Sequence, residues 1–328
     1  MPVFNARRYL LASLRSVLSQ DITDFELLVI NDGSTDGSEG LLAVVDDPRV
    51  RVINQDHAGI VSALNRGLNE ARGDLIARMD ADDIALPHRL RLQLQFMNAN
   101  PDIHLLGTRF LYIDARGRTL YSPPWPTRDE EIRRILPVFN CFTHPTVMFR
   151  KQSVLALGGY RQELQYQEDY DLWLRLIDRH RVAQLDDMLL YYRLSRASIS
   201  FKNRHQQSTV LDGMVKELSR QRRSEGQDLL QRGAGLTELR IELEQLATPR
   251  AKRRRWGRQM IGMAQGCLQA GRRLQSIQFA LEAVWNDPGT RWNWTVLGRS
   301  FAPDWLRAQA VYARRRWRMA AIAPTLGA

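Results

Sequence analysis

Three acidic residues within four positions form the first feature of this sequence that could do chemistry. Asp80, Asp82 and Asp83 directly follow the apolar run 75–79, which predicts a buried strand. In open α/β sheets, ligands bind beyond the carboxyl ends of the strands. Hard carboxylate oxygens suit Mg²⁺ or Mn²⁺, which are typically held by a few carboxylates together with substrate phosphates. The alternative is a solvated turn that caps the helix expected to begin near Pro87.

A second polar segment, residues 31–38, also follows an expected strand. Asp32 could accept hydrogen bonds from a nucleobase, and the following glycines and hydroxyls could form an anion-binding turn. The alternative is an ordinary turn in which Ser34 or Thr35 caps the next helix. Neither a GxxxxGK[ST] nor a GxGxxG motif occurs, so the sequence supports neither a P-loop nor a dinucleotide fingerprint.

A third acidic feature, Glu168-Asp169, stands at the start of a helix expected over residues 169–178. A carboxylate in that position can act as a general base that takes a proton from a hydroxyl group. The alternative is the ordinary preference for acidic residues at helix N-termini, where the helix dipole favours negative charge.

The expected strands and helices that must position these acids alternate with one another along the first part of the chain. This alternation, through about residue 110, predicts a mostly parallel sheet with helices on both faces, and the pattern to residue 200 predicts a mixed remainder. From residue 202 the pattern is helical, with breaks near 233–235, 249 and 286–289. Strands are expected at 25–30, 50–53, 75–79, 110–113, 147–149 and 188–192, and helices at 7–20, 60–71, 87–97 and 169–178.

Composition places the chain among ordinary globular proteins. It has 328 residues, of which 44% are apolar and 25% charged. Cys141 and Cys267 are too few for a disulfide framework, which favours a reducing cytosol. No apolar run approaches the ~18 residues of a membrane-spanning helix, and no secretory leader is recognisable at the start. We therefore expect a cytoplasmic protein.

Charge divides the chain into two regions that we expect to be domains. Residues 1–201 hold 24 Lys and Arg against 26 Asp and Glu, whereas residues 202–328 hold 23 against 10. The second region, with a net charge of +13, predicts an anionic partner. Aromatic residues among arginines at 303–319 are typical of an interfacial helix on anionic lipid, or of a solvated basic face. No nucleic-acid recognition motif is present, so we expect no nucleic-acid partner.

Taken in order, the motifs of the first 200 residues resemble those of family 2 glycosyltransferases, which have the GT-A fold. The resemblance predicts a GT-A-type, Rossmann-like mixed α/β sheet with helices on both faces, followed here by an all-helical region. The matching segments are Met1-Pro2-Val3-Phe4-Asn5-Ala6, Leu28-Val29-Ile30-Asn31-Asp32-Gly33-Ser34-Thr35-Asp36, Met79-Asp80-Ala81-Asp82-Asp83, His144-Pro145-Thr146-Val147-Met148-Phe149-Arg150, Gly158-Gly159-Tyr160, Glu168-Asp169-Tyr170-Asp171-Leu172-Trp173 and Tyr192-Arg193.

The resemblance implies roles for individual residues. Asp169 would be the catalytic base, next to Glu168. Asp82 and Asp83 would bind the divalent cation, Mg²⁺ or Mn²⁺. The nucleotide-sugar would be bound by Pro2, Phe4, Asn5, Asp32, Asp80 and Ala81. The chain departs from the family pattern in having no histidine after Tyr192-Arg193, and it begins inside the expected first strand.

These roles imply an inverting glycosyltransferase that moves a sugar from a nucleotide-diphosphate sugar to a hydroxyl group. The implied acceptor is a glycan or a lipid-linked glycan in bacterial surface polysaccharide, lipopolysaccharide or glycolipid synthesis, at the inner face of the membrane. Trp125 lies in an expected loop, where it could stack on an acceptor sugar. The alternatives are an inactive nucleotide- or glycan-binding relative and a nucleotidyltransferase. The latter predicts a Gly- and Lys-rich loop, which residues 2–5 do not supply.

Overall fold

In the computed structural model, the apolar run after Phe25 becomes the central strand of a three-stranded parallel sheet. The order is β1 (Pro2–Val3), β2 (Leu27–Asp32) and β3 (Val50–Gln55), and β2 is buried along its whole length. Full burial is typical of parallel strands that are covered on both faces. The strands expected at 25–30 and 50–53 are therefore confirmed, with small shifts of their ends.

Three helices accompany this sheet: α1 (Arg7–Leu18), α2 (Ser38–Ala43) and α3 (Ile60–Glu70). The apolar positions of α1 recur at helical spacing, and Leu10 and Leu14 are buried in the same cluster as Val29 of β2. Helical periodicity predicted α1 and α3, whereas α2 has too few residues to show a period.

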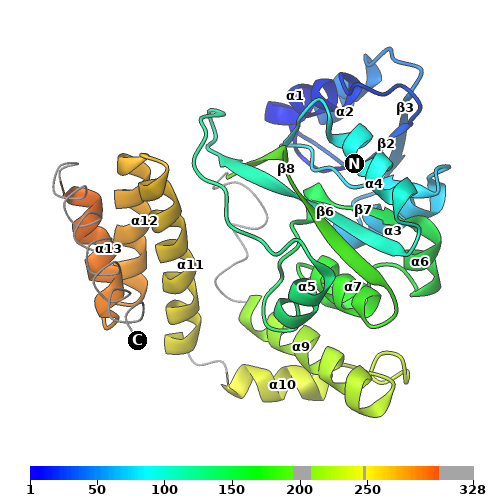
Figure 1. Ribbon diagram of the computed structural model, residues 1–328. Helices are drawn as coiled ribbons and strands as arrows, with labels where there is room; N and C mark the ends of the chain where they lie inside the picture. Colours follow the sequence, from blue (N-terminus) through cyan, green and yellow to red (C-terminus); the bar gives the residue numbers. More distant parts are fainter. Residues whose placement is uncertain (195–207, 247–248, 303–328) are drawn as a thin grey trace, which may run out of the picture. The chain divides into compact units, whose positions relative to one another are not determined.

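The second sheet has five strands in the order β4 (Leu75–Ala77), β7 (Met148–Arg150), β6 (Ile103–Ile113), β8 (Arg181–Arg193) and β5 (Ile84–Ala85). Its long strands β6 and β8 run parallel and side by side (Figure 1), while the other neighbouring strands are antiparallel. The expected mixed arrangement is confirmed. The strand at 75–79 pairs with β7 and not within the parallel sheet, because pairing direction depends on distant partners that periodicity does not reveal.

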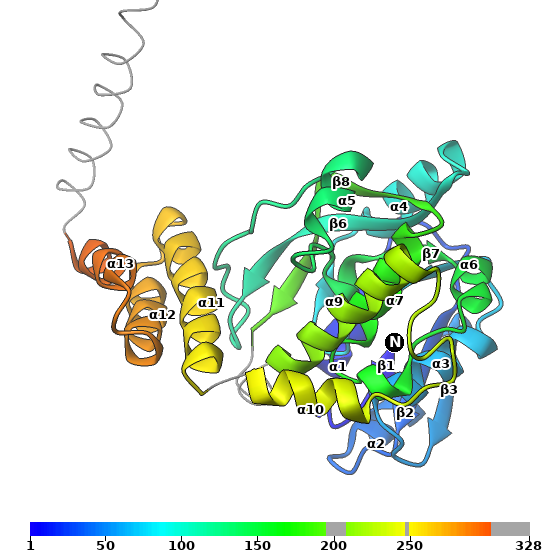
Figure 2. The ribbon, with the colours of Figure 1, turned by 90° about the horizontal axis from the view of Figure 1, so that it is seen from below.

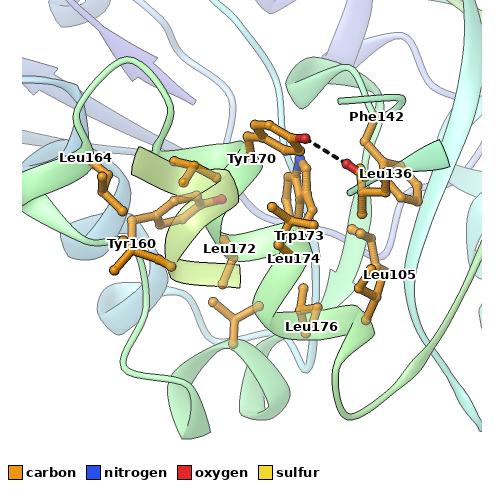
Figure 3. Packing of buried hydrophobic residues seen from close by; sticks show 14 of the residues in the cluster. Leu105, Leu136, Phe142, Tyr160, Leu164, Tyr170, Leu172, Trp173, Leu174 and Leu176 are labelled. Atoms are coloured by element: carbon orange, nitrogen blue, oxygen red, sulfur yellow. Dashed lines mark hydrogen bonds between the residues drawn. The ribbon is translucent and has the colours of Figure 1, made fainter. Parts of the chain in front are cut away.

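Helices α4 (Arg89–Ala99), α5 (Asp129–Ile135), α6 (Lys151–Ala156) and α7 (Glu168–Ile177) complete this part, with short 3-10 turns η1 (His144–Thr146) and η2 (Gln162–Leu164). Nearly every residue of α7 is buried. Figure 3 shows its Trp173 and Leu176 packed with Leu105 of β6, and the Tyr170 hydroxyl donating to the Leu136 carbonyl oxygen. This core fixes the position of the acidic N-terminus of α7.

The structure describes residues 1–194, 208–246 and 249–302, and the chain divides into two compact units, residues 1–248 and 249–328. Helices α9 (Ser208–Glu225) and α10 (Thr237–Leu246) belong to the first unit. Met214 and Leu218 of α9 are buried in the same core as Trp173, and Figure 2 shows α9 beside α7. The domain boundary expected between residues 201 and 202 stays a prediction, and the first compact unit extends beyond it, to residue 248.

Buried ion pairs also join α9 to α7. Asp228 pairs with Arg161 at 2.8 Å and with Arg222 of α9 at 2.6 Å. Arg161 and Arg175 both pair with Asp171 of α7, at 3.4 and 2.8 Å. Because both aspartates are fully buried, this network of ion pairs ties α9 to the helix that carries Glu168 and Asp169.

The second unit, taken by itself, contains α11 (Pro249–Gln269), α12 (Arg273–Asn286) and α13 (Arg291–Phe301), which confirms the breaks expected near 249 and 286–289. Its small core includes Met260, Ala264 and Ala280. The interfacial helix expected at 303–319 lies outside the described residues. Across the part of the chain that the structure describes, no helix has both the length and the apolar character needed to cross a membrane.

Candidate active site

The loop between β4 and β5 brings the three predicted carboxylates together. One oxygen atom from each of Asp80, Asp82 and Asp83 lies within 4.8 Å of the other two. Three negative charges at this spacing repel one another unless a cation offsets them. Because all the donor atoms are carboxylate oxygens, the group matches the ligand preference of Mg²⁺ or Mn²⁺.

Asp83 shows that these residues fit a cation. Its side chain is 1% exposed, and its Oδ1 accepts a hydrogen bond of 2.7 Å from the backbone N–H of Arg193. Its Oδ2 is buried and, among the described residues, has no hydrogen-bond partner. A buried polar atom without a partner is costly, and a bound cation would remove that cost. Burial, reinforced by the negative charge of Asp80, raises the pKa of Asp83 well above its ordinary value and that of Asp82 to about 6.

Neighbouring elements hold the acidic loop in place. The Ser13 hydroxyl of α1 donates to the Asp80 carbonyl oxygen at 2.8 Å, and the Ser16 hydroxyl accepts the Ala85 N–H at 3.0 Å. From β8, Arg193 Nε donates to the Asp82 carbonyl oxygen at 2.7 Å. The loop is therefore fixed by α1 on one side and by the end of β8 on the other.

Arg78 is a site residue that sequence reasoning missed. Its guanidinium is almost completely buried and forms an ion pair with Asp80, and its carbonyl oxygen accepts a hydrogen bond of 2.7 Å from Arg89 Nη2. The positive charge of Arg78 lowers the pKa of both Asp82 and Asp169, against the effect of burial. The signal that could have revealed it was an arginine inside an otherwise apolar strand pattern.

Asp32, at the end of β2, is buried and fully engaged. Its Oδ1 accepts hydrogen bonds from Gln55 Nε2 at 2.6 Å and from the Ala58 N–H at 2.9 Å. Its Oδ2 accepts the Gly59 N–H at 2.9 Å and lies 2.9 Å from His57 Nδ1. All the common acceptor positions of the carboxylate are therefore in use. His57 was not identified from the sequence, because only the fold brings it to Asp32.

The predicted nucleotide-binding residues near the N-terminus adjoin Asp32. The exposed ring of Phe4 stacks on His57, with ring centroids 4.0 Å apart. Asn5 donates its N–H to the Ser34 hydroxyl at 3.0 Å, and its side-chain oxygen accepts the Thr35 N–H at 2.8 Å. Pro2 is paired to β2 at Ile30, two residues before Asp32. The structure thus brings residues 2–5 and the turn after Asp32 together.

Ala81 packs the acidic loop against β1, which carries part of the predicted nucleotide-binding segment. It is buried in one hydrophobic cluster with Val3 of β1, which lies within the predicted segment 2–5, and with Met79, which precedes the acidic loop. The cluster packs β1 and the acidic loop into a single body.

The two acidic residues of α7 occupy different environments. Asp169 is half-buried; its Oδ1 accepts the Tyr170 N–H at 2.7 Å, and its Oδ2 is 3.4 Å from the Asn140 side-chain nitrogen. Glu168 is buried, and its Oε2 has no hydrogen-bond partner among the described residues. Burial raises the pKa of Asp169 to about 6 and that of Glu168 to about 7. A carboxylate with such a pKa is suited to general base catalysis near neutral pH.

Comparison with known proteins adds family evidence to this geometry. The sequence model described as Glycosyl transferase family 2 matches residues 1–158. The O-antigen biosynthesis glycosyltransferase WbnJ of Escherichia coli is 35% identical over 204 residues, which cover 60% of this chain and 79% of WbnJ. The amylovoran biosynthesis glycosyltransferase AmsE of Erwinia amylovora is 35% identical over 186 residues, 55% of this chain and 68% of AmsE.

A solved structure shows the same fold. Residues 1–349 of TarS from S. aureus, in complex with UDP-GlcNAc, align with a TM-score of 0.55 at 16% identity, over 90% of this chain and 89% of that one. The α/β fold of GT-A type that the sequence predicts is therefore confirmed.

Proposed function

This chain belongs to glycosyltransferase family 2, and we propose that it transfers a sugar, with inversion, from a nucleotide-diphosphate sugar to an acceptor hydroxyl group. One observation carries the proposal: a cluster of three carboxylates lies in the same unit as a half-buried carboxylate whose pKa is raised to about 6. The carboxylate cluster is suited to a cation that would also bind the diphosphate of the donor. The single carboxylate is suited to accepting a proton. Together they supply the two functions that glycosyl transfer needs.

On the donor side, Asp82 and Asp83 would hold Mg²⁺ or Mn²⁺, and Asp80 would contact the donor next to them. The unpartnered Oδ2 of Asp83 supports this assignment. A bound cation would neutralise charge on the departing diphosphate. Arg78 holds the Asp80 carboxylate in place through their ion pair.

We assign the nucleobase to Asp32 and to the neighbouring residues Pro2, Phe4 and Asn5. The ring of His57 supports this assignment, because it is half-exposed, stacks on Phe4 and lies against Asp32 Oδ2. A planar base that carries an N–H donor could take both of these contacts. The base would then replace His57 on the carboxylate and on the aromatic ring.

On the acceptor side, Asp169 acts as the base. It takes the proton of the acceptor hydroxyl while the hydroxyl oxygen bonds to the anomeric carbon. The bond from that carbon to the diphosphate breaks, and the electron pair leaves with the nucleoside diphosphate. Asp169 is favoured over Glu168 because its side chain is partly exposed, whereas Glu168 is buried. Asn140 and the Tyr170 N–H orient its carboxylate.

The acceptor that we propose is a glycan or a lipid-linked glycan of a bacterial surface polysaccharide. The names of the two relatives support this class, since one acts in O-antigen and the other in amylovoran biosynthesis.

We further propose that the second unit makes peripheral contact with the cytoplasmic face of an anionic membrane. Leu274, Leu281 and Trp285 share one face of α12, because they are spaced seven and four residues apart. All three are exposed, as is Trp294 of α13, and Trp285 is 85% exposed. Residues 249–302 also hold ten basic residues against two acidic ones. Exposed aromatic residues beside excess positive charge are typical of interfacial binding to anionic lipid.

A thermal-shift series tests the proposed donor. The melting temperature is measured with UDP-, GDP- and dTDP-sugars, each with and without Mn²⁺. We expect one nucleotide class to raise the melting temperature selectively and more strongly with Mn²⁺, since a ligand at 100 times its Kd stabilises the folded state by about 2.7 kcal/mol. The absence of a shift with every nucleotide-sugar would contradict the proposal.

A further inference from the structure

Two aromatic side chains stack at the surface beside the proposed base. The rings of Trp125 and Phe139 have centroids 5.4 Å apart and planes inclined by 30°. Trp125 is partly buried against the core, whereas Phe139 is 54% exposed and the preceding Val138 is 69% exposed. An exposed aromatic ring that is supported from one side, with an exposed apolar neighbour, offers an apolar surface to a ligand.

The backbone that presents Phe139 is held firmly. Leu136, at the end of α5, is fully buried, and its carbonyl oxygen accepts a 2.7 Å hydrogen bond from the Tyr170 hydroxyl (Figure 3). The N–H groups of Val138 and Phe139 both donate to the Ile135 carbonyl oxygen at 2.9 Å. The exposed ring is therefore preorganised on a turn that is anchored to α7, which reduces the entropic cost of binding a ligand.

The next residue connects this turn with the proposed base. Asn140 reaches Asp169 Oδ2 with its side-chain nitrogen, at 3.4 Å, and accepts the Phe142 N–H with its side-chain oxygen, at 3.1 Å. Asn140, the residue that follows Phe139 in the chain, thus contacts the Asp169 carboxylate with its side chain. A molecule that covers the Phe139 ring would lie next to the group that takes the proton.

We propose that Phe139, supported by Trp125, is the platform on which the acceptor sugar ring stacks, so that one of its hydroxyl groups reaches Asp169. This inference rests on the proposed function and extends it to an acceptor subsite. A sugar ring combines an apolar C–H face with a rim of hydroxyl groups, and so matches an aromatic ring beside an amide and a carboxylate. A hydrocarbon tail would cover Asp169 without offering it a hydrogen-bond donor.

Binding of simple glycosides tests the platform. Saturation-transfer-difference NMR is recorded with the full chain, Mn²⁺ and a mixture of UDP, GDP and dTDP. The probes are methyl β-D-glucopyranoside, methyl β-D-galactopyranoside and methyl N-acetyl-β-D-glucosaminide. We expect at least one glycoside to bind, and Phe139→Ala to weaken its binding roughly tenfold, by loss of an aromatic contact. Phe139→Tyr should restore the affinity, because it keeps the ring.

Val44→Ala is the matched control, because Val44 is an apolar side chain of the same unit, 74% exposed, that adjoins none of the site residues. It should leave glycoside binding unchanged. Nucleotide binding, followed by the melting temperature, reports on the proposed function separately and should persist in all three variants. Equal glycoside affinity of the wild type and Phe139→Ala would overturn the platform, as would the absence of glycoside binding to a wild type that binds nucleotide.

Discussion

The backbone N–H of Arg193 donates a 2.7 Å hydrogen bond to the carboxylate of Asp83, 110 residues earlier in the chain. The end of β8 therefore closes the acidic loop that begins after β4. Asp83 therefore contributes to the structure of the loop, because it is buried and accepts a hydrogen bond from β8. Asp82 is more exposed.

Substitution of Asp82 should therefore separate metal binding from folding. We expect Asp82→Asn to lower transfer by roughly 10²-fold or more, because the cation stabilises the leaving group, and to abolish the effect of Mn²⁺ on nucleotide affinity. Its melting temperature should stay close to that of the wild type. Asp83→Ala should lower the melting temperature as well, because it removes the acceptor of the buried Arg193 N–H. Calorimetric titration with nucleotide, with and without Mn²⁺, checks both variants, and near-normal turnover of Asp82→Asn would refute the metal assignment.

Substitution of Asp169 should affect chemistry and leave donor binding intact. We expect Asp169→Asn to bind the nucleotide-sugar normally and to lose transfer by about 10²–10⁴-fold, the usual contribution of a general base. Glu168→Gln, which changes the buried neighbour, should cost less. Calorimetry measures donor affinity and product formation measures turnover. If Asp169→Asn fails to bind the donor, the residue has another role.

The raised pKa of Asp169 predicts how activity depends on pH. The base must be ionised to accept a proton, so kcat/KM should fall as the pH decreases below about 6. A plateau that continues to pH values well below that pKa would contradict the role of Asp169.

Stability should follow the opposite trend. An acid whose pKa is higher in the folded than in the unfolded chain binds its proton more tightly when folded. Its contribution to stability is therefore present at low pH and is lost as the pH rises through about 6. The melting temperature of Asp169→Asn minus that of the wild type should accordingly become more positive from about pH 5 to about pH 8. A constant difference would show that burial does not perturb this carboxylate.

Much of this site could be predicted from the sequence, because strand ends carry a local signal. Asp32, Asp80 and Asp169 each border an apolar or periodic segment, and the sequence alone identified all three as candidates. His57 and Asn140 could not be found in this way, since their contacts with Asp32 and Asp169 depend on how distant segments meet. Arg78 was missed although it carried a local signal, an arginine inside an apolar run. Short elements such as α5 and β5 were missed for a related reason, because they contain too few residues to display a period.

The buried ion pairs around Asp228 predict that α9 stabilises the first unit. Asp228→Asn would remove the carboxylate that forms the shortest ion pairs of both Arg161 and Arg222, and removal of one member of a buried ion pair costs about 3–5 kcal/mol. We expect a clearly lower melting temperature by calorimetry. Asp186→Asn, at an exposed ion pair with Arg109, is the control and should change stability little. Equal effects of the two substitutions would mean that α9 is not integral to the fold.

Exposed aromatic residues of the second unit predict how the protein binds vesicles. The double variant Trp285→Gln and Trp294→Gln should co-sediment more weakly with anionic vesicles, and the binding that remains should be sensitive to salt, because each basic residue near the surface contributes ~1 kcal/mol of screened attraction. Val44→Gln, a comparable change in the first unit, should bind like the wild type. Equal sedimentation of all three proteins, or none with anionic vesicles, would argue against membrane contact.

Sugar transfer itself is the most direct test of the central claim. The purified protein is incubated with UDP-, GDP- and dTDP-sugars, Mn²⁺ and the three methyl glycosides, and mass spectrometry follows the nucleoside diphosphate and the glycosylated product. We predict that one donor class yields both products in equal amounts, with inverted anomeric configuration, and that Asp169→Asn yields almost none. Release of no nucleoside diphosphate from any donor by the wild type, or equal product from Asp169→Asn, would contradict the account.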